Sequence, residues 1–151
     1  MGFPQFIPTS YQAYAVDFDG DGKRDLWHNP VDAIGSVGNY FARHGWTADD
    51  AIITAAKGPS TPPKVIEFNQ TQKPYASVST LREQGIEADT GSLEDSAKVV
   101  PLVLEREDGT MRYELGHNNF YVITRYNHSH LYAMAVTTLA QCIRDALENE
   151  A

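Results

Sequence analysis

The chain of 151 residues has one cysteine, no long apolar run and no concentration of basic residues. Because Cys142 stands alone, no disulfide can form within the chain, and cysteine pairing does not indicate a redox compartment. No apolar run approaches the roughly 18 residues that a membrane-spanning helix needs, and the N-terminus lacks the features of a signal peptide. We therefore expect a soluble chain without a targeting segment of its own.

Basic residues are also few, at 12 against 20 acidic ones, which gives a formal net charge of −8. The basic residues are scattered singly along the chain, so nucleic acid is not an expected partner. A negative potential instead favours the binding of divalent cations. The length and the apolar fraction of 42% are those of one globular domain, with one sizeable core or two small ones.

The first third of the chain predicts two helices on either side of an acidic loop. TSYQAYAV, residues 9–16, fits a short helix. The second helix is predicted to have Asn29 as its N-cap residue, Pro30 at the first helical position and Gly45 at its end. Apolar residues of this second helix recur at helical spacing, namely Val31, Ile34, Val37 and Phe41.

The middle of the chain predicts a small, mainly antiparallel insert. After the breaker cluster KGPSTPP come β-like runs at residues 65–68, 98–105 and 111–115, with a turn at Asp108-Gly109. Between them, SVSTLREQGI predicts a short helix with Ser79 as its cap and Gly85 as its stop.

The last segment returns to helical spacing. In SHLYAMAVTTLAQCIRDALE one face carries Leu131, Met134 or Ala135, Leu139, Ile143 and Leu147. The fold class predicted is therefore α+β, with an α-helical core interrupted by the β-rich insert. We divide it into residues 1–51, a helical part with the acidic loop; 52–116, the insert; and 117–151, the return to the helical core.

The acidic loop DFDGDGKRDLW, residues 17–27, has the spacing of a calcium loop. An EF-hand loop takes oxygen ligands from positions 1, 3, 5 and 7, the last through its backbone carbonyl, and needs glycine at position 6. Asp17, Asp19, Asp21, Gly22 and Lys23 fill these positions in order.

The loop departs from the EF-hand pattern at position 12, where His28 replaces the bidentate Glu. The nearest downstream carboxylate is Asp32, which completes a ligand set only if the loop is longer than the standard one. Oxygen ligands of this kind suit Ca²⁺ better than Mg²⁺. The metal set predicted is Asp17, Asp19, Asp21, Lys23 and Asp32 around a structural Ca²⁺; the alternative is a solvated Asp-Gly turn.

Two long blocks carry a resemblance to a known family. GFPQFIPTSYQAYAVDFDGDGKRDLWHNPVDAIGSVGNYFARHGW and FYVITRYNHSHLYAMAV resemble the membrane-bound lytic murein transglycosylase B family, glycoside hydrolase family 103. The resemblance implies a lysozyme-like α-helical core with a small β-rich insert and one EF-hand-like calcium loop. Residues 52–116 match that family only in their general pattern of short β-like runs and turns.

The same resemblance implies a peptidoglycan-cleaving activity. The family cuts the bond between N-acetylmuramic acid (MurNAc) and N-acetylglucosamine (GlcNAc) without water, using one glutamate as acid and then base, and leaves a 1,6-anhydro ring. In the family this glutamate lies upstream of GFPQF, so we expect no catalytic residue within this chain. Glu67, Glu105, Glu107 and Glu114 have no counterpart as catalyst.

Sugar-binding residues are carried over where the two blocks match the family. They are Gln5 in GFPQF, Tyr40 in GNYF, Tyr126 and Asn127 in RYN, and Tyr132 in HLYAM. The resemblance implies hydrogen bonds from the two amides to sugar groups and flat apolar faces from the tyrosines. Read without it, each tyrosine is more typical of core packing.

The partners implied are peptidoglycan glycan strands, the missing N-terminal part of the same domain and, as an open option, other cell-wall enzymes. The location implied is the periplasm of the bacterial cell envelope, with an outer-membrane anchor in a missing N-terminus as one mode of attachment.

The sequence leaves two functions open. One is a lytic transglycosylase of which this chain is a portion, and the other is a non-catalytic, calcium-stapled module that binds peptidoglycan.

Overall fold

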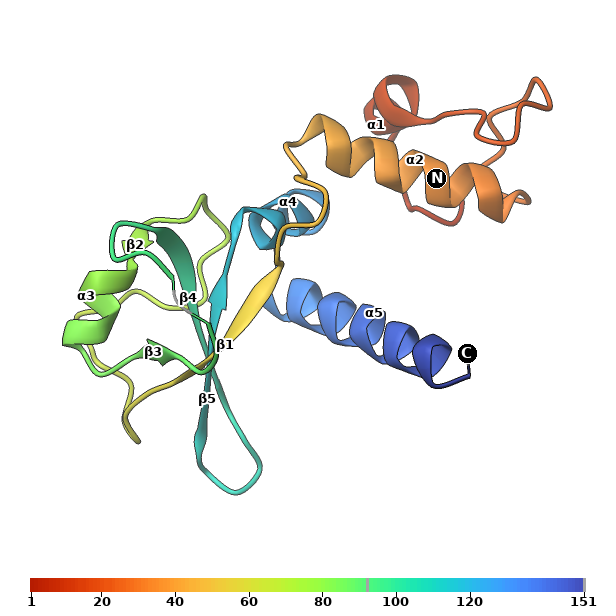
Figure 1. Ribbon diagram of the computed structural model, residues 1–151. Helices are drawn as coiled ribbons and strands as arrows, with labels where there is room; N and C mark the ends of the chain where they lie inside the picture. The colour runs from red at the N-terminus through yellow and green to blue at the C-terminus, as the bar shows by residue number, and fades with distance from the viewer. Residues whose placement is uncertain (92, 151) are drawn as a thin grey trace. The chain divides into compact units, whose positions relative to one another are not determined.

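A computed structural model of the chain describes residues 1–91 and 93–150 (Figure 1). Its contacts divide the chain into two compact units, Met1–Trp46 and Thr47–Ala151, called here the N-terminal and the C-terminal unit. Helices and antiparallel strands are both present, which confirms the mixed α+β class. The predicted division at residues 51 and 116 would group the last segment with the first helices, and it stays a prediction.

The N-terminal unit contains helices α1 (Pro8–Tyr14) and α2 (Pro30–Arg43) joined by the acidic loop. The predicted start of α2 is confirmed, because the Asn29 side chain accepts hydrogen bonds from the amides of Val31 and Asp32. Helix α1 ends two residues earlier than predicted, since Ala15 already has an extended backbone.

The buried face of α2 is not the apolar one that its spacing suggests. Its buried residues are Asp32, Ala33, Ser36 and Tyr40, whereas Ile34 is 73% exposed. Polar side chains on this helix hold the chain that runs beside it: Asn39 Nδ2 donates to the carbonyl of Tyr14 at 3.0 Å, and Ser36 Oγ accepts from the amide of Val16 at 3.0 Å. We call Asn29, Asp32, Ser36 and Asn39 the polar seam of α2.

The C-terminal unit is built on one antiparallel sheet. Its strands are β1 (Ile53–Lys57), β2 (Ala76–Ser77), β3 (Glu87–Ala88), β4 (Lys98–Glu105) and β5 (Met111–Gly116), in the order β2-β4-β5-β1-β3. The predicted runs at 98–105 and 111–115 form the central hairpin, in which Glu105 pairs with Met111. The expected antiparallel β-rich segment is therefore present, and its role as an insert in a helical core stays a prediction.

Both faces of this sheet are covered (Figure 1). Side chains alternate between the faces along a strand. On one face, Val99, Tyr113 and Leu115 pack with Val78, Leu81 and Ile86 from the α3 region. On the other face, Gly116 lies against the fully buried ring of Phe120, where an added Cβ would come within 2.8 Å of that ring.

Two local predictions for this unit are wrong. Residues 65–68 are not a strand, because Ile66 donates its amide to Pro63 and closes a turn beside two prolines. Helix α3 (Val78–Glu83) is capped by Ser77, whose side chain accepts from the amide of Thr80, and not by Ser79. The predicted cap lay two residues too late because both serines suit an N-cap.

Helix α4 (Asn118–Tyr126), for which no helix was predicted, precedes α5 (His130–Glu150). Asn119, 1% exposed, accepts from the amide of Thr47 and donates to the carbonyls of Thr47 and Asp50. It thereby fixes the chain that enters the sheet. In the described ranges no helix combines the length and apolar character needed to cross a bilayer.

The central strand predicts a clear stability effect. We expect Leu115→Ala to lower the free energy of unfolding of the C-terminal unit by about 2–5 kcal/mol, because Leu115 is 1% exposed and its removal leaves a cavity. Denaturant unfolding followed by circular dichroism measures it. Leu147→Ala, at a position 63% exposed, is the matched control and should change stability by less than about 0.5 kcal/mol; equal losses would contradict the assigned core.

Candidate metal centre and glycan-facing residues

Four carboxylates gather at the acidic loop. Asp17, Asp19, Asp21 and Asp32 each offer one oxygen, and these oxygens all lie within 4.8 Å of one another. Three come from the loop, and Asp32 comes from the first turn of α2, where its side chain is fully buried. The structure therefore brings Asp32 to the loop. A ligand set that includes Asp32 needs a loop longer than the standard one.

Backbone amides of the loop point at its own carboxylates. Asp17 accepts from the amides of Gly20 and Gly22, both at 2.8 Å, and Asp21 Oδ1 accepts from the amide of Lys23 at 2.8 Å. Gly22 has a φ of +89°, a left-handed conformation that other residues rarely adopt. The glycine at position 6 thus makes the sharp turn that gathers the aspartates.

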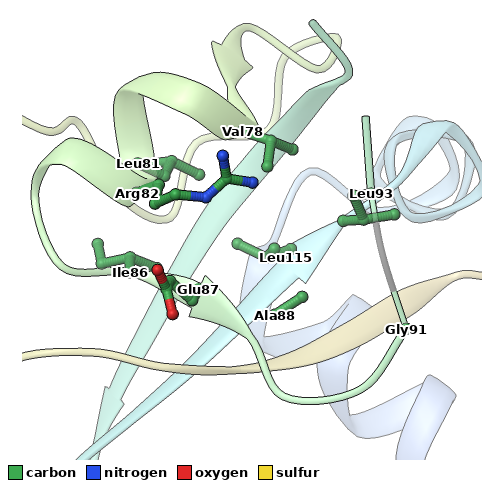
Figure 2. A pocket seen from close by; sticks show the side chains of 9 residues that line it. All are labelled: Val78, Leu81, Arg82, Ile86, Glu87, Ala88, Gly91, Leu93 and Leu115. Carbon is green, nitrogen blue, oxygen red and sulfur yellow. The ribbon is translucent and has the colours of Figure 1, made fainter. Parts of the chain in front are cut away.

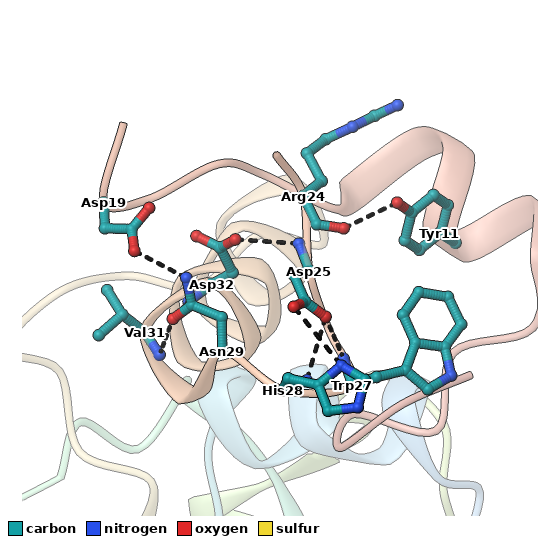
Figure 3. Close-up of polar contacts among 9 residues, drawn as sticks. All are labelled: Tyr11, Asp19, Arg24, Asp25, Trp27, His28, Asn29, Val31 and Asp32. Carbon is teal, nitrogen blue, oxygen red and sulfur yellow. Dashed lines mark hydrogen bonds and ion pairs between the residues drawn. The ribbon is translucent and has the colours of Figure 1, made fainter. Parts of the chain in front are cut away.

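Asp32 joins the two ends of the loop. Its Oδ1 accepts from the amide of Phe18 at 2.8 Å. Its Oδ2 accepts from the amide of Asp25 at 3.0 Å (Figure 3). Asn29 adds a third link, because its Nδ2 donates to Asp19 Oδ2 at 2.7 Å. The residues of the polar seam therefore set the shape of the loop from α2.

Asp25 and His28 do not belong to the carboxylate cluster. Asp25 Oδ1 accepts from the amides of His28 and Trp27, both at 3.0 Å, and these bonds hold the pKa of Asp25 below its usual range. The His28 side chain is 87% exposed and lies 3.7 Å from Asp25. Asp32, not the residue at position 12, is thus the carboxylate that joins the three loop aspartates.

The hydrogen bond from Asn29 likewise lowers the pKa of Asp19. A lowered pKa in the folded state favours the carboxylate, so any stability it brings is present above the ordinary carboxyl pKa of 3.8. That stability is lost as the pH falls through the lowered values. Asp19 is exposed and Asp25 is partly exposed, and contact with water limits the size of the effect.

Four carboxylates this close repel one another unless a cation lies among them. The amides that reach them compensate only part of the charge. An all-oxygen donor set of three loop aspartates and one buried aspartate is the chemistry that hard cations such as Ca²⁺ prefer. The residues therefore fit a divalent cation at the loop.

The predicted sugar-binding residues of the N-terminal unit have different environments. Gln5 is exposed, has a φ of 56° and donates from Nε2 to the carbonyl of Gly2 at 2.7 Å. Tyr40 is 9% exposed, and its ring stacks on that of His44 with centroids 4.0 Å apart. Gln5 is thus at the surface, whereas Tyr40 is mainly part of an aromatic cluster.

The other three predicted residues lie together in the C-terminal unit, where α4 passes into α5. The rings of Tyr126 and Tyr132 stack with centroids 6.4 Å apart and an interplanar angle of 24°. Asn127, between them in the chain, is exposed and ends α4. Gln5 and Tyr40 belong to the other unit, so a single site containing all five stays a prediction.

The glutamates named above lack the setting of an acid/base catalyst. Glu67, Glu105 and Glu107 are exposed. Glu114 is 6% exposed, but Arg112 donates to its Oε1 from Nε at 2.8 Å and also from Nη2. The Oε1 atom of Glu114 is therefore engaged by Arg112, whereas a general acid must bring its proton to the substrate.

An apolar pocket lies elsewhere in the C-terminal unit (Figure 2). Leu81, Ile86 and Leu115 line it, and Arg82 and Glu87 provide its polar groups. The guanidinium of Arg82 is paired with Asp95 at 2.6 Å. None of the predicted sugar-binding or metal-binding residues is among the described residues that line this pocket, which continues the apolar core of the C-terminal unit.

Sequence reasoning missed the wider role of the polar seam. Asn29 was identified only as a cap, although it also bonds to Asp19, and Ser36 was not singled out. A signal was present, because the seam residues are spaced by three, four and three along one helix, which places them on one face.

Comparison with known proteins identifies the family. The model of the transglycosylase SLT domain matches residues 1–141. The chain therefore belongs to the transglycosylase SLT domain family, as the two sequence blocks predicted.

Among curated proteins, membrane-bound lytic murein transglycosylase B of Escherichia coli K12 is 44% identical over 148 residues, which are 95% of this chain and 37% of that protein. Among solved structures, the Escherichia coli lytic transglycosylase Slt35 in complex with calcium is 44% identical, with a TM-score of 0.83 over 97% of this chain and 44% of that one. SltB3 of Pseudomonas aeruginosa in complex with NAG-NAM-pentapeptide is 32% identical, with a TM-score of 0.76 over 95% of this chain and 38% of that one. The chain thus spans less than half of each relative.

The role of Asp32 can be tested by Asp32→Asn in the presence of a chelator. An amide would present a donor to the amide of Phe18 or of Asp25, so we expect a loss of about 1–3 kcal/mol in the free energy of unfolding of the N-terminal unit. Asp21→Asn is the matched control, because its Oδ1 can still accept from the amide of Lys23. Equal stability of the two variants in chelator, measured by denaturant unfolding, would refute the assigned role.

Proposed function

We propose that this chain is the calcium-stabilised, glycan-facing portion of a peptidoglycan lytic transglycosylase. The reaction is non-hydrolytic cleavage of the MurNAc-β-1,4-GlcNAc bond, which leaves 1,6-anhydromuramic ends. The observation that carries the proposal is the 44% identity to lytic murein transglycosylase B over 95% of this chain. The NAG-NAM-pentapeptide complex of SltB3 supports peptidoglycan strands as the ligand.

The metal in this proposal is one structural Ca²⁺ in an EF-hand-like loop. Its ligands would be the carboxylates of Asp17, Asp19, Asp21 and Asp32 and the backbone carbonyl of Lys23. The gathered carboxylates and the calcium complex of Slt35 support this assignment. A cation here would offset the repulsion among the aspartates and hold the loop on α2, which is a stapling role and not a signalling one.

In this proposal, the acid/base glutamate is none of the glutamates of this chain and lies in another portion of the enzyme. A carboxyl group that first donates and then accepts a proton needs an apolar setting that keeps it protonated. The exposed glutamates lack that setting, and Glu114 is paired with Arg112. This portion would therefore bind and orient the glycan, while another portion of the enzyme supplies the proton.

Glycan contacts are assigned to Gln5, Tyr40, Tyr126, Asn127 and Tyr132. Asn127 is exposed beside two stacked tyrosines, which offers an amide for a sugar hydroxyl or acetamido group and flat rings for a sugar face. Gln5 is exposed in the other unit, and Tyr40 would support the site from within its aromatic cluster.

The finer architecture and location belong to the same proposal. The helices of residues 1–51 and 117–151 would form parts of a lysozyme-like core, with residues 52–116 as its insert. The membrane-bound relative supports a place in the periplasm of the bacterial cell envelope.

Calcium binding is tested by thermal unfolding in Ca²⁺ and in chelator. Ca²⁺ should raise the melting temperature, because a ligand that binds only the folded state stabilises it. Asp21→Asn removes one charge from the cluster and should weaken Ca²⁺ binding by roughly tenfold or more. Asp49→Asn, an exposed change outside the loop, is the control and should leave the shift unchanged. No Ca²⁺-dependent shift in the unaltered chain would overturn the metal assignment.

The activity is tested by a chimera in which this chain replaces the matching segment of lytic murein transglycosylase B. Incubated with peptidoglycan sacculi, the chimera should release 1,6-anhydromuropeptides, detected by mass spectrometry. The same chimera with Asn127→Ala should be at least tenfold slower, because a sugar contact is lost.

Two results would contradict the proposal. A chimera that melts cooperatively yet releases no such product would argue against the assigned function. Release of 1,6-anhydromuropeptides by residues 1–151 alone would show that a glutamate of this chain is the catalyst.

A further inference from the structure

Asn29 is the residue at which the acidic loop passes into α2 (Figure 3). Its Oδ1 accepts from the amide of Val31 at 3.0 Å and from the amide of Asp32 at 3.4 Å, which is the ordinary role of an N-cap residue. Its Nδ2 donates to Oδ2 of Asp19 at 2.7 Å. One planar amide therefore holds the start of the helix at one end and a carboxylate of the loop at the other.

The helix does not need the second of these contacts. An N-cap side chain has only to accept a hydrogen bond, and Ser, Thr and Asp do so about as well as Asn. Of these four residue types, Asn alone carries its donor and its acceptor on two separate atoms of one planar group. While the oxygen of Asn29 caps α2, its nitrogen is thus free to hold a loop carboxylate.

The orientation of Asp19 depends on this bond more than the orientation of the other assigned ligands does. Asp17 and Asp32 are held by short hydrogen bonds from backbone amides. Asp19 is exposed, and the backbone bond to its Oδ1, from the amide of Asp21, is longer at 3.2 Å. The shorter bond to Asp19 comes from the Asn29 side chain, and a hydrogen bond to a charged acceptor is stronger than one between neutral groups.

A ligand that is oriented before the cation arrives loses less freedom when the cation binds. Residues that hydrogen-bond to metal ligands orient them in this way, and their loss typically weakens metal binding at least tenfold. The amide of Asn29 is also neutral, so it holds the carboxylate of Asp19 without adding a charge that would repel a cation.

We propose that Asn29 is a positioning residue for the cation of the acidic loop, and that its bond to Asp19 raises the affinity of the loop for Ca²⁺. This inference rests on the proposed function, because it needs the Ca²⁺ assigned there, and it adds a residue outside the assigned ligand set. It also links cation binding to the first turn of α2, where the assigned ligand Asp32 lies.

The test is a calorimetric titration of Ca²⁺ into the metal-free full chain and its variants. Asn29→Ser is the informative variant, because serine still caps the helix but has no amide with which to hold Asp19. We expect the dissociation constant for Ca²⁺ to rise roughly tenfold.

Asn29→Ala separates the two contacts, because alanine removes both of them. It should weaken Ca²⁺ binding at least as much as Asn29→Ser does. In chelator, Asn29→Ala should also melt at a lower temperature than Asn29→Ser, because only the alanine variant loses the cap.

Ser77→Ala is the matched control for the loss of a cap. It removes the N-cap of α3 in the C-terminal unit, which contains none of the assigned Ca²⁺ ligands. We expect this variant to melt at a lower temperature and to bind Ca²⁺ with the affinity of the unaltered chain.

The outcomes separate this inference from the proposed function. A loss of Ca²⁺ affinity confined to the two Asn29 variants supports the inference. Unchanged affinity in Asn29→Ser would show that Asn29 acts only as a cap, and equal losses in Asn29→Ser and Ser77→Ala would show that affinity follows overall stability. Either result overturns the inference and leaves the calcium site standing, whereas no Ca²⁺ binding by the unaltered chain overturns both.

Discussion

The buried carboxylate of Asp32 is the constraint on which the N-terminal unit depends. It accepts the amides of Phe18 and Asp25, which stand at the two ends of the acidic loop, so one side chain of α2 sets the width of that loop. This arrangement brings the carboxylate of Asp32 close to the three carboxylates of the loop, and the four negative charges repel one another. The same geometry that closes the loop therefore creates the demand for a cation.

In the C-terminal unit, neutral amide side chains hold the backbone through hydrogen bonds in a similar way. Asn119 on α4 holds residues 47 and 50, and Asn69 holds the edge of β4. Asn119 and Asp32 satisfy backbone groups of irregular segments, whereas the Asn69 side chain pairs with the backbone of Val103 in β4. The segments fixed in this way include the acidic loop and the chain that enters the sheet, and in both the side chain that fixes the backbone is buried.

The sequence predicts the regular elements well where the signal is local. Asn29 with Pro30 marks the start of α2, and the β-like runs at 98–105 and 111–115 give the central hairpin within one residue. Spacing also predicts which carboxylates gather, and the two long blocks predict the family. The β-like composition at 65–68 misled because two preceding prolines direct that segment into a turn.

What the sequence could not predict depends on contacts between distant residues. Apolar spacing in α2 points to Ile34, yet the polar seam decides which face is buried, because its partners lie in the preceding chain. Lys73 and Arg125 likewise line one surface hollow, although they are 52 positions apart in the chain and meet only through the fold.

The most direct test of this account is a titration of Ca²⁺ into the isotope-labelled chain, followed by NMR of the backbone amides. The account predicts a saturable change, at one Ca²⁺ per chain, in the amides of Gly20 and Gly22 and of the residues bonded to Asp32, with Mg²⁺ far less effective. Amide shifts that do not saturate, or that saturate away from residues 17–32, would contradict a calcium-stabilised loop at the centre of this unit.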